Sequence, residues 1–232
     1  MKNALIILFI FVSQMAWNQA KNPDALFNLL KRKYAGVKDY TVDANIKVDV
    51  WFLKMPEKNV KIFYKFPDKV HIEAEGFAML PKNASGFDPS VFISEKFTAV
   101  YIRSEELGNS TVDLIKTIPM DTEGDVILRT FWIDPQKLEI RKLEVNTKSG
   151  GTFQVDLNYN NLPHDLPQKL YVVSDMKGMD MPKTLTGEVP DNSKKDKTAK
   201  SGKGNVTITY SNYKVNTGLS DKIFEEKKAG KK

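Results

Sequence analysis

The residue types that carry most enzyme chemistry are scarce in this chain and poorly placed for catalysis. The 232 residues include two histidines and no cysteine, which excludes thiol nucleophiles, disulfide scaffolds and cysteine-ligated metal centres. Glu73 and Glu75 are two residues apart on an expected strand, so both carboxylates lie on one face and could form a general acid–base pair. A charged, solvent-facing side of a strand has the same spacing, and we prefer this interpretation.

The histidines and one glycine-containing segment provide no further catalytic site. His71 lies on the polar face of the same expected strand, and His164 lies in a turn sequence, so both are expected to be solvated. The segment 200–204 (KSGKG) resembles a phosphate-binding loop only superficially, because the first glycine and the following Ser or Thr of that motif are missing. The sequence therefore predicts no catalytic residues, no metal and no cofactor.

A run containing five lysines is the strongest local charge in a chain whose formal charge is +6. It lies within residues 190–204 (PDNSKKDKTAKSGKG), which are polar, low in complexity and expected to form a flexible basic loop. Such a run could contact nucleic acid or an anionic membrane surface. No aromatic side chain is interleaved for base stacking, and export is expected, so we predict no nucleic-acid partner.

The first twenty residues have the pattern of a secretory signal peptide. A positive residue precedes an unbroken apolar run over residues 4–12, and small residues follow, including Ala16 and Ala20. The run is shorter than the roughly 20 apolar residues that span a bilayer. We expect residues 1–20 to be removed, with cleavage after Ala20 or Ala16, and residues 21–232 to form one exported domain. Without a cysteine to carry a lipid, we expect the protein not to be a lipoprotein.

Hydrophobic periodicity predicts one helix followed by many strands. Asn22-Pro23 can cap and open a helix, Leu26, Leu30 and Tyr34 form its apolar stripe, and Gly36 can end it. From residue 40 onward the period changes to two, which is typical of half-buried strands. The expected strands cover residues 40–52, 60–66, 70–74, 99–103, 112–118, 126–133, 138–146, 152–159, 169–175 and 206–213.

Turn sequences between these strands predict an antiparallel meander. Asp134-Pro135 and the segment 148–151 (KSGG) separate three successive strands. Almost every strand has one apolar face, and a sheet of about ten to eleven strands must curl to bury such a face. The expected fold class is α+β, mainly β: an incomplete, curved antiparallel β-barrel whose open side is closed by the N-terminal helix and short helices.

Large apolar side chains also gather in two segments that lack strand periodicity. Residues 76–97 are rich in Phe, Met, Gly and Pro, and Asp88-Pro89 could begin a short helix there. The second segment contains Met176, Met179 and Met181, and methionine side chains adapt to irregular contact surfaces. Both segments fit a lid and mouth around a lipid-sized cavity, and they fit equally well core packing beneath long loops. The side chains concerned are Phe77, Met79, Leu80, Phe87, Phe92, Met176, Met179 and Met181.

The order of these elements resembles the LolA/LolB-type outer-membrane lipoprotein-sorting family. The resemblance rests on residues 34–40 (YAGVKDY) after the helix, 64–67 (YKFP) at a strand end, 131–135 (FWIDP) in the later meander, and 210–221 (YSNYKVNTGLSD) near the C-terminus. It covers nearly the whole mature chain and contains no catalytic signature. In the family an arginine of a strand-end Arg-Pro helps to hold the lid, and Lys65 is the corresponding candidate here.

The resemblance implies a non-enzymatic periplasmic carrier that shields acyl chains in a hydrophobic cavity during transfer to the outer membrane. Each buried methylene is worth about 0.8 kcal/mol, so several acyl chains cannot cross water unshielded. The implied partners are acylated lipoproteins or lipids, an inner-membrane lipoprotein-release complex and an outer-membrane receptor, and the protein is expected to be a monomer. An envelope lipid or lipoprotein sensor and a structural adaptor with the same fold are alternatives, and an envelope enzyme is the least favoured.

The expected cavity lining combines inward-facing strand residues with apolar residues of the two irregular segments. The predicted lining residues are Val48, Val50, Phe52, Ile62, Tyr64, Phe66, Ile72, Phe77, Met79, Leu80, Phe92, Met176 and Met179.

Overall fold

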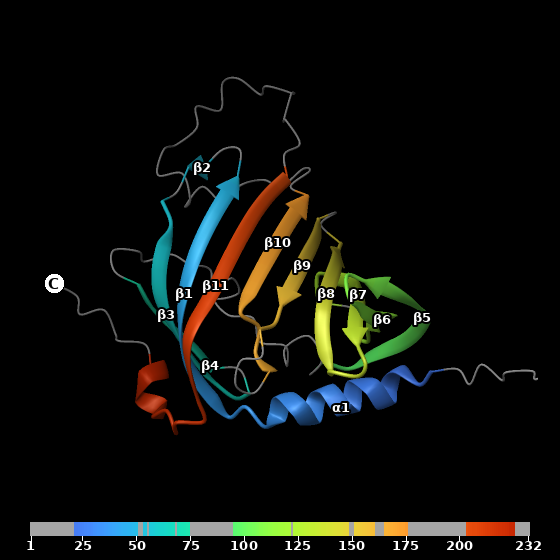
Figure 1. Cartoon of the computed structure of the whole chain (residues 1–232), viewed down its shortest axis with the longest axis horizontal. Helices are drawn as coiled ribbons and strands as arrows, with labels where there is room; N and C mark the ends of the chain where they lie inside the picture. The colour runs from blue at the N-terminus through green and yellow to red at the C-terminus, as the bar shows by residue number, and fades with distance from the viewer. Residues whose placement is uncertain are drawn as a thin grey trace, which may run out of the picture.

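Helix α1 (Pro23–Ala35) lies across one end of a curved antiparallel sheet (Figure 1). The computed structural model describes residues 21–50, 53–54, 56–67, 69–74, 95–121, 123–148, 151–160, 165–175 and 203–225. The predicted signal peptide, nearly all of the two irregular apolar segments and most of the basic loop lie outside these residues.

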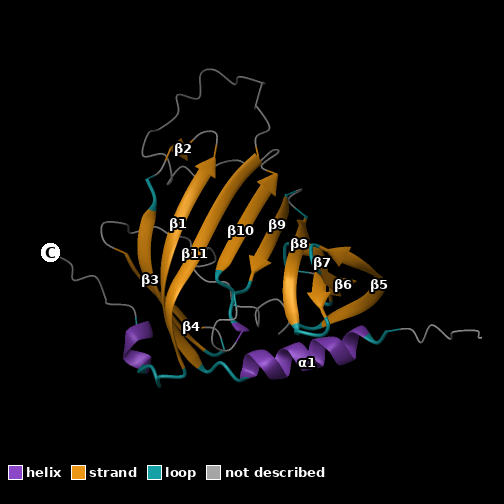
Figure 2. Ribbon diagram, in the orientation of Figure 1, coloured by secondary structure: helices purple, strands orange, loops and turns teal. Residues whose placement is uncertain are grey.

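Eleven strands form the sheet, which Figure 2 shows as one continuous bent surface. Their spatial order is β4-β3-β1-β11-β10-β9-β8-β7-β6-β5, and the short β2 pairs with β1. The strands are β1 (Asp39–Val50), β2 (Leu53–Lys54), β3 (Lys58–Lys65), β4 (Lys69–Ala74), β5 (Phe97–Leu107), β6 (Ser110–Pro119), β7 (Val126–Asp134), β8 (Glu139–Thr147), β9 (Thr152–Asn158), β10 (Lys169–Asp175) and β11 (Lys203–Val215).

This order consists of two meanders joined by one long-range pair. Strands β5 to β11 are consecutive neighbours, and β1, β3 and β4 form the second meander. The two meanders meet where β1 pairs with β11, so the first and last long strands lie in the interior of the sheet. Strands β4 and β5 are its two edges. The sheet is open, which confirms the predicted incomplete barrel.

The helix forms as the sequence predicts. The Asn22 side chain accepts a hydrogen bond from the backbone N–H of Ala25 at 3.2 Å, and Gly36 follows the last turn. The buried stripe differs in one position, because Phe27 is buried and Leu26 only partly so. The Phe27 ring packs edge-on against Phe97 of β5 and Phe131 of β7, with ring centroids 4.9 and 5.3 Å apart. These contacts dock the helix on the inner face of the sheet.

Strand periodicity correctly predicts which side of the sheet is apolar. Val42, Ala44 and Ile46 of β1 are almost fully buried, while the alternate residues from Thr41 to Asp49 are partly or fully exposed. In the register with β11, Ala44 lies opposite Tyr210 and Ile46 opposite Ile208. Side chains directly opposite in antiparallel strands share a face, so each pair adds two apolar groups to the same side.

One predicted turn uses a side chain to satisfy its backbone. The carboxylate of Asp134 accepts hydrogen bonds from the backbone N–H groups of Gln136 and Lys137, both at 3.0 Å. This arrangement is an Asx-type turn, and it explains why the Asp134-Pro135 sequence separates β7 from β8.

Most strand boundaries differ from the sequence prediction by one to four residues, and three of the differences affect strand pairing or the inner face. Strand β5 runs from Phe97 to Leu107, beyond the expected residues 99–103, because a bulge between Tyr101 and Arg103 resets its pairing with β6. Strand β11 begins at Lys203, so the last two residues of the predicted loop 190–204 belong to the sheet. Phe66 does not continue the inward-facing row, since it lies in the turn after β3 with 48% of its surface exposed.

Hydrogen bonds to a buried carboxylate link the start of β1 to the segment that follows β11. Asp39 is 4% exposed, and its side chain accepts hydrogen bonds from the backbone N–H groups of Thr217 and Gly218 at 2.8 and 3.0 Å. Gly218 has φ +76°, a left-handed conformation that favours glycine. Asn216 adds two bonds, accepting from the Lys38 N–H at 2.7 Å and donating to the Gly36 carbonyl at 2.9 Å.

Replacing Asp39 by alanine should lower the free energy of unfolding by about 2–3 kcal/mol, because two backbone N–H groups lose a charged acceptor. Asp49, on the same strand but exposed, is the matched control, and Asp49→Ala should change stability by less than about 0.5 kcal/mol. Denaturant unfolding followed by far-ultraviolet circular dichroism measures both. Equal stability of the two variants would contradict the role given to Asp39.

Candidate functional site

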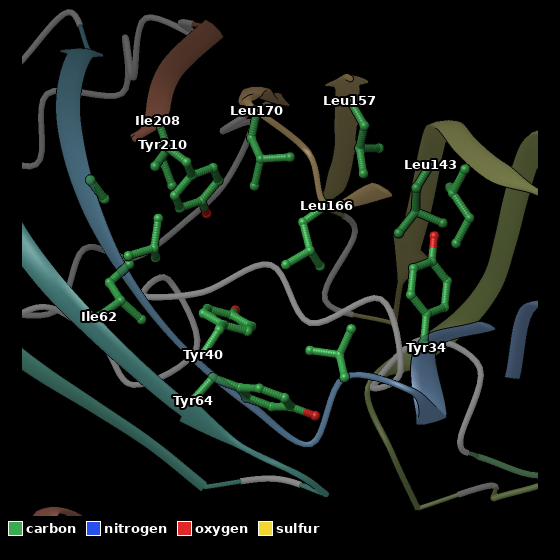
Figure 3. Packing of buried hydrophobic residues seen from close by; sticks show 14 of the residues in the cluster. Tyr34, Tyr40, Ile62, Tyr64, Leu143, Leu157, Leu166, Leu170, Ile208 and Tyr210 are labelled. Atoms are coloured by element: carbon green, nitrogen blue, oxygen red, sulfur yellow. The ribbon is translucent and has the colours of Figure 1, made fainter. Parts of the chain in front are cut away.

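The inner face of the sheet carries one continuous apolar cluster (Figure 3). Its side chains come from both meanders and from α1, and they point toward a shared interior. Ile62 of β3, Leu170 of β10 and Ile208 of β11 are at most 4% exposed, as are Phe131 and Leu143 on the other side of the cluster. The cluster is the hydrophobic core of the described residues, and because it covers the inner face of the sheet it is the candidate functional site.

Tyrosines give this interior a polar but uncharged component. The rings of Tyr40 and Tyr64 stack with centroids 4.9 Å apart, and the Tyr64 hydroxyl donates to the Pro67 carbonyl at 3.3 Å. The Tyr213 hydroxyl donates to the Pro167 carbonyl at 2.9 Å. Burial raises the pKa of Tyr213 well above its ordinary value, so the hydroxyl stays neutral.

The tyrosine of α1 shows the same effect. Burial raises the pKa of Tyr34 and of Tyr159, and the Tyr159 hydroxyl donates to the Ile140 carbonyl at 3.1 Å. Because these hydroxyls are neutral and donate to backbone carbonyls, the tyrosines contribute ring surface to the inner face without adding a charge of their own.

The structure brings together four of the predicted lining residues. Ile62 and Tyr64 are buried in the cluster, and Val48 and Ile72 are partly buried against it. For Val50 the structure describes the backbone in β1 but not the side chain. Seven further predicted residues lie outside the described residues and stay predictions: Phe52, Phe77, Met79, Leu80, Phe92, Met176 and Met179.

Lys65 binds the C-terminal segment. Its ammonium group donates to the Leu219 carbonyl at 2.8 Å and lies 3.0 Å from the carboxylate of Asp221, the first residue of the 3₁₀-helix η3 (Asp221–Phe224). Lys69 donates to the same carboxylate at 2.9 Å. The hydrogen bonds from Lys69 and Lys65 lower the pKa of Asp221. Lys65 therefore holds η3 beside β3 and β4. The contact between Lys65 and a lid stays a prediction.

A pocket of about 1030 Å³ flanks the edge strand β4 and η3. Its lining mixes apolar side chains with charged ones, including Lys61, His71 and Glu73. The Nε2 atom of His71 lies 4.0 Å from Oε1 of Glu73, and both side chains are exposed. This exposure agrees with the solvated strand face that we prefer from the sequence. Glu75, the other member of the suggested carboxylate pair, lies outside the described residues.

Two buried charges on the inner face were not predicted from the sequence. Asp113 of β6 is 3% exposed, and its carboxylate accepts hydrogen bonds from the Lys21 ammonium at 2.5 Å and the Ser104 hydroxyl at 2.6 Å. Arg129 of β7 is 4% exposed and donates to the Glu95 carboxylate at 2.8 Å. In both strands a single charged residue occupies a position that the alternating pattern assigns to the inner face. This break in the pattern could have indicated both buried charges from the sequence.

Two absences hold for the described part of the chain. There, no helix has the length and apolar character needed to cross a membrane. Nor do three or more acidic, histidine or cysteine side chains come together in a way that could hold a metal ion.

An open, curved antiparallel sheet with an apolar inner face and a helix across one end defines a class with solved members. A LolA superfamily protein from Nitrosomonas europaea superposes with a TM-score of 0.56 at 11% identity, over 89% of this chain and 99% of that one. A DUF1329 family protein from Desulfovibrio piger gives a TM-score of 0.59 at 12% identity, over 88% and 97%.

An outer membrane lipoprotein-sorting protein domain from Vibrio parahaemolyticus gives a TM-score of 0.51 at 12% identity, over 88% of this chain and 97% of that one. No family model and no curated protein matches the sequence itself. The chain therefore has a LolA-like fold, which confirms the resemblance seen in its sequence at the level of structure.

Replacing Lys65 by methionine should release η3 from the sheet. The change removes a charged donor to the Leu219 carbonyl and to Asp221, and amide hydrogen exchange at Ile223 should become about tenfold faster. Lys47→Met is the control, because Lys47 is exposed and 3.6 Å from its partner Glu57. Unchanged exchange at Ile223 would show that Lys65 does not hold the segment.

Proposed function

We propose that the protein is a periplasmic, non-enzymatic carrier that binds the acyl chains of lipids or lipoproteins on the apolar inner face of its sheet. The observation that carries the proposal is the combination of a LolA-like fold with one uninterrupted apolar cluster on that face. The sheet is open at both edges, so a ligand can reach the inner face without passing through a closed barrel.

The energetics of acyl chains make such a face necessary for transport. Transfer of an acyl chain of about sixteen carbons from an apolar site into water costs on the order of 10 kcal/mol of free energy. A carrier has to provide a surface that replaces the membrane interior. The inner rows of β1, β3, β10 and β11 offer aliphatic side chains and neutral tyrosine rings for this purpose.

The periplasmic part of the proposal is supported by the predicted signal peptide over residues 1–20. The transfer part is supported by analogy with proteins of the same fold, one of which is named for outer membrane lipoprotein sorting. A lipid sensor would bind the same ligands on the same face. A transfer assay separates the two roles, because a carrier passes its ligand to acceptor vesicles and a sensor retains it.

The purified mature chain should bind a fluorescent acylated peptide saturably. Val48→Asp should weaken this binding at least tenfold, because it places a carboxylate among the apolar side chains of the inner face. Lys47→Asp is the matched control, since the neighbouring side chain is exposed, and it should leave the dissociation constant unchanged.

Fluorescence titration measures the affinities, and circular dichroism checks that both variants keep the fold. Absence of saturable binding by the unmodified chain would refute the proposal. Equal affinity of the two variants would place the ligand elsewhere on the protein.

A further inference from the structure

Arg129 places a permanent positive charge on the apolar face of the sheet. It is two residues from Phe131 on β7, so the two side chains point to the same side. In the register Arg129 lies opposite Thr117 of β6 and opposite Val145 of β8. Phe131 belongs to the apolar cluster, and Val145 packs against it. The Arg129 side chain therefore extends from the same side of the sheet as the apolar cluster.

Most of the hydrogen-bonding capacity of this guanidinium is unused. Nη2 donates to the Glu95 carboxylate at 2.8 Å, and the Arg129 side chain is only 5% exposed. Nε and Nη1 have no hydrogen-bond partner among the described residues. Nε carries one N–H and Nη1 carries two, so three of the five donors are without an acceptor. Buried charges of this kind are normally fully paired, because an unpaired one is costly.

Thr117 supplies a second unused polar group at the same place. It is fully buried, and its hydroxyl Oγ1 has no partner among the described residues. Directly opposed residues of antiparallel strands have Cβ atoms about 5 Å apart, so the hydroxyl and the guanidinium can reach one small group together. A fork of N–H donors with a neighbouring O–H donor matches the oxygens of a carboxylate or a phosphate.

We propose that Arg129 and Thr117 bind the anionic headgroup, a carboxylate or a phosphate, of an amphiphilic ligand whose acyl chain lies against the apolar cluster. This inference rests on the proposed function, because it names the headgroup of the ligand that the inner face binds. The cationic site fixes the polar end of the ligand, and the apolar rows hold its chain.

Glu95 acts as the internal competitor for this site. Its side chain is 47% exposed, and it also lines a pocket of about 380 Å³ between α1 and the start of β5, together with Phe27, Phe97 and Met120. A ligand carboxylate that takes its place on Nη2 releases Glu95 to water, where its charge is solvated. One oxyanion is exchanged for another, and the buried guanidinium is never left without a counter-charge.

The test compares palmitate with methyl palmitate, which have the same chain and differ in the charged group. Both displace a fluorescent acylated probe from the full mature chain, below the concentration at which they form micelles. Palmitate should bind about tenfold more tightly than the ester. Arg129→Met should abolish this preference by weakening the binding of palmitate. Arg103→Met, at an exposed arginine on β5, is the control and should retain the preference.

Two further variants keep the test decisive if Arg129→Met does not fold. Arg129→Lys keeps the charge and loses the fork, so it should reduce the preference at least threefold. Glu95→Gln removes the competitor and should raise the affinity for palmitate severalfold without changing that for the ester. Equal binding of acid and ester by the unmodified chain, or an undiminished preference in the Arg129 variants, would overturn the inference.

Further competitors distinguish an amphiphile headgroup from a free anion. They also distinguish failure of this inference from failure of the proposed function. A lysophospholipid with a free phosphate should compete like palmitate, whereas millimolar inorganic phosphate should not displace the probe. Displacement by inorganic phosphate alone would mean that the site binds free anions and would overturn the amphiphile assignment. Binding of the ester without any preference for the acid refutes this inference only, whereas absence of binding by every acylated compound refutes the proposed function.

Discussion

The pairing of β1 with β11 is the constraint on which the rest of the structure depends. Strand β1 supplies the buried row Val42, Ala44 and Ile46, and β11 supplies Ile208 and Tyr210 directly beside it. Each of the two meanders is built from local contacts, but neither encloses an interior alone. When these two strands pair, the apolar sides of the two meanders become one curved face, and α1 packs on it against β5 and β7. The inner face is therefore a product of the most distant contact in the sequence.

The corner around Asp39 secures this pairing, and it joins the parts of the sequence that resemble the LolA family. Residues 36–39 bind residues 216–218 through the Asp39 carboxylate and the Asn216 side chain, and Lys65 binds the Leu219 carbonyl next to them. Three motifs that are far apart in the chain thus meet in one place. These short stretches join the strand ends and lie apart from the residues of the apolar cluster that are proposed to contact a ligand.

The elements governed by local periodicity could be predicted, whereas those governed by distant partners could not. The alternation of β1 and the Asn22 cap of α1 specify themselves, because they need only neighbouring residues. Phe27 could have been found from its spacing with Leu30 and Tyr34, since all three lie on one helix face. Arg129 looked like an ordinary charge in a strand. Its importance depends on Thr117 and Glu95, which only the folded sheet brings to it.

The position of β11 has a consequence for how the protein is made. Because β11 comes from residues 203–215 and completes the interior of the sheet, β1 has a neighbour on only one side until nearly the whole chain has been synthesised. Contacts between residues so far apart in sequence slow folding, since a long loop must close before they can form. Until β11 is made, the two meanders cannot share an inner face, and their apolar sides stay exposed. Such exposed apolar surface favours aggregation until the last strand arrives.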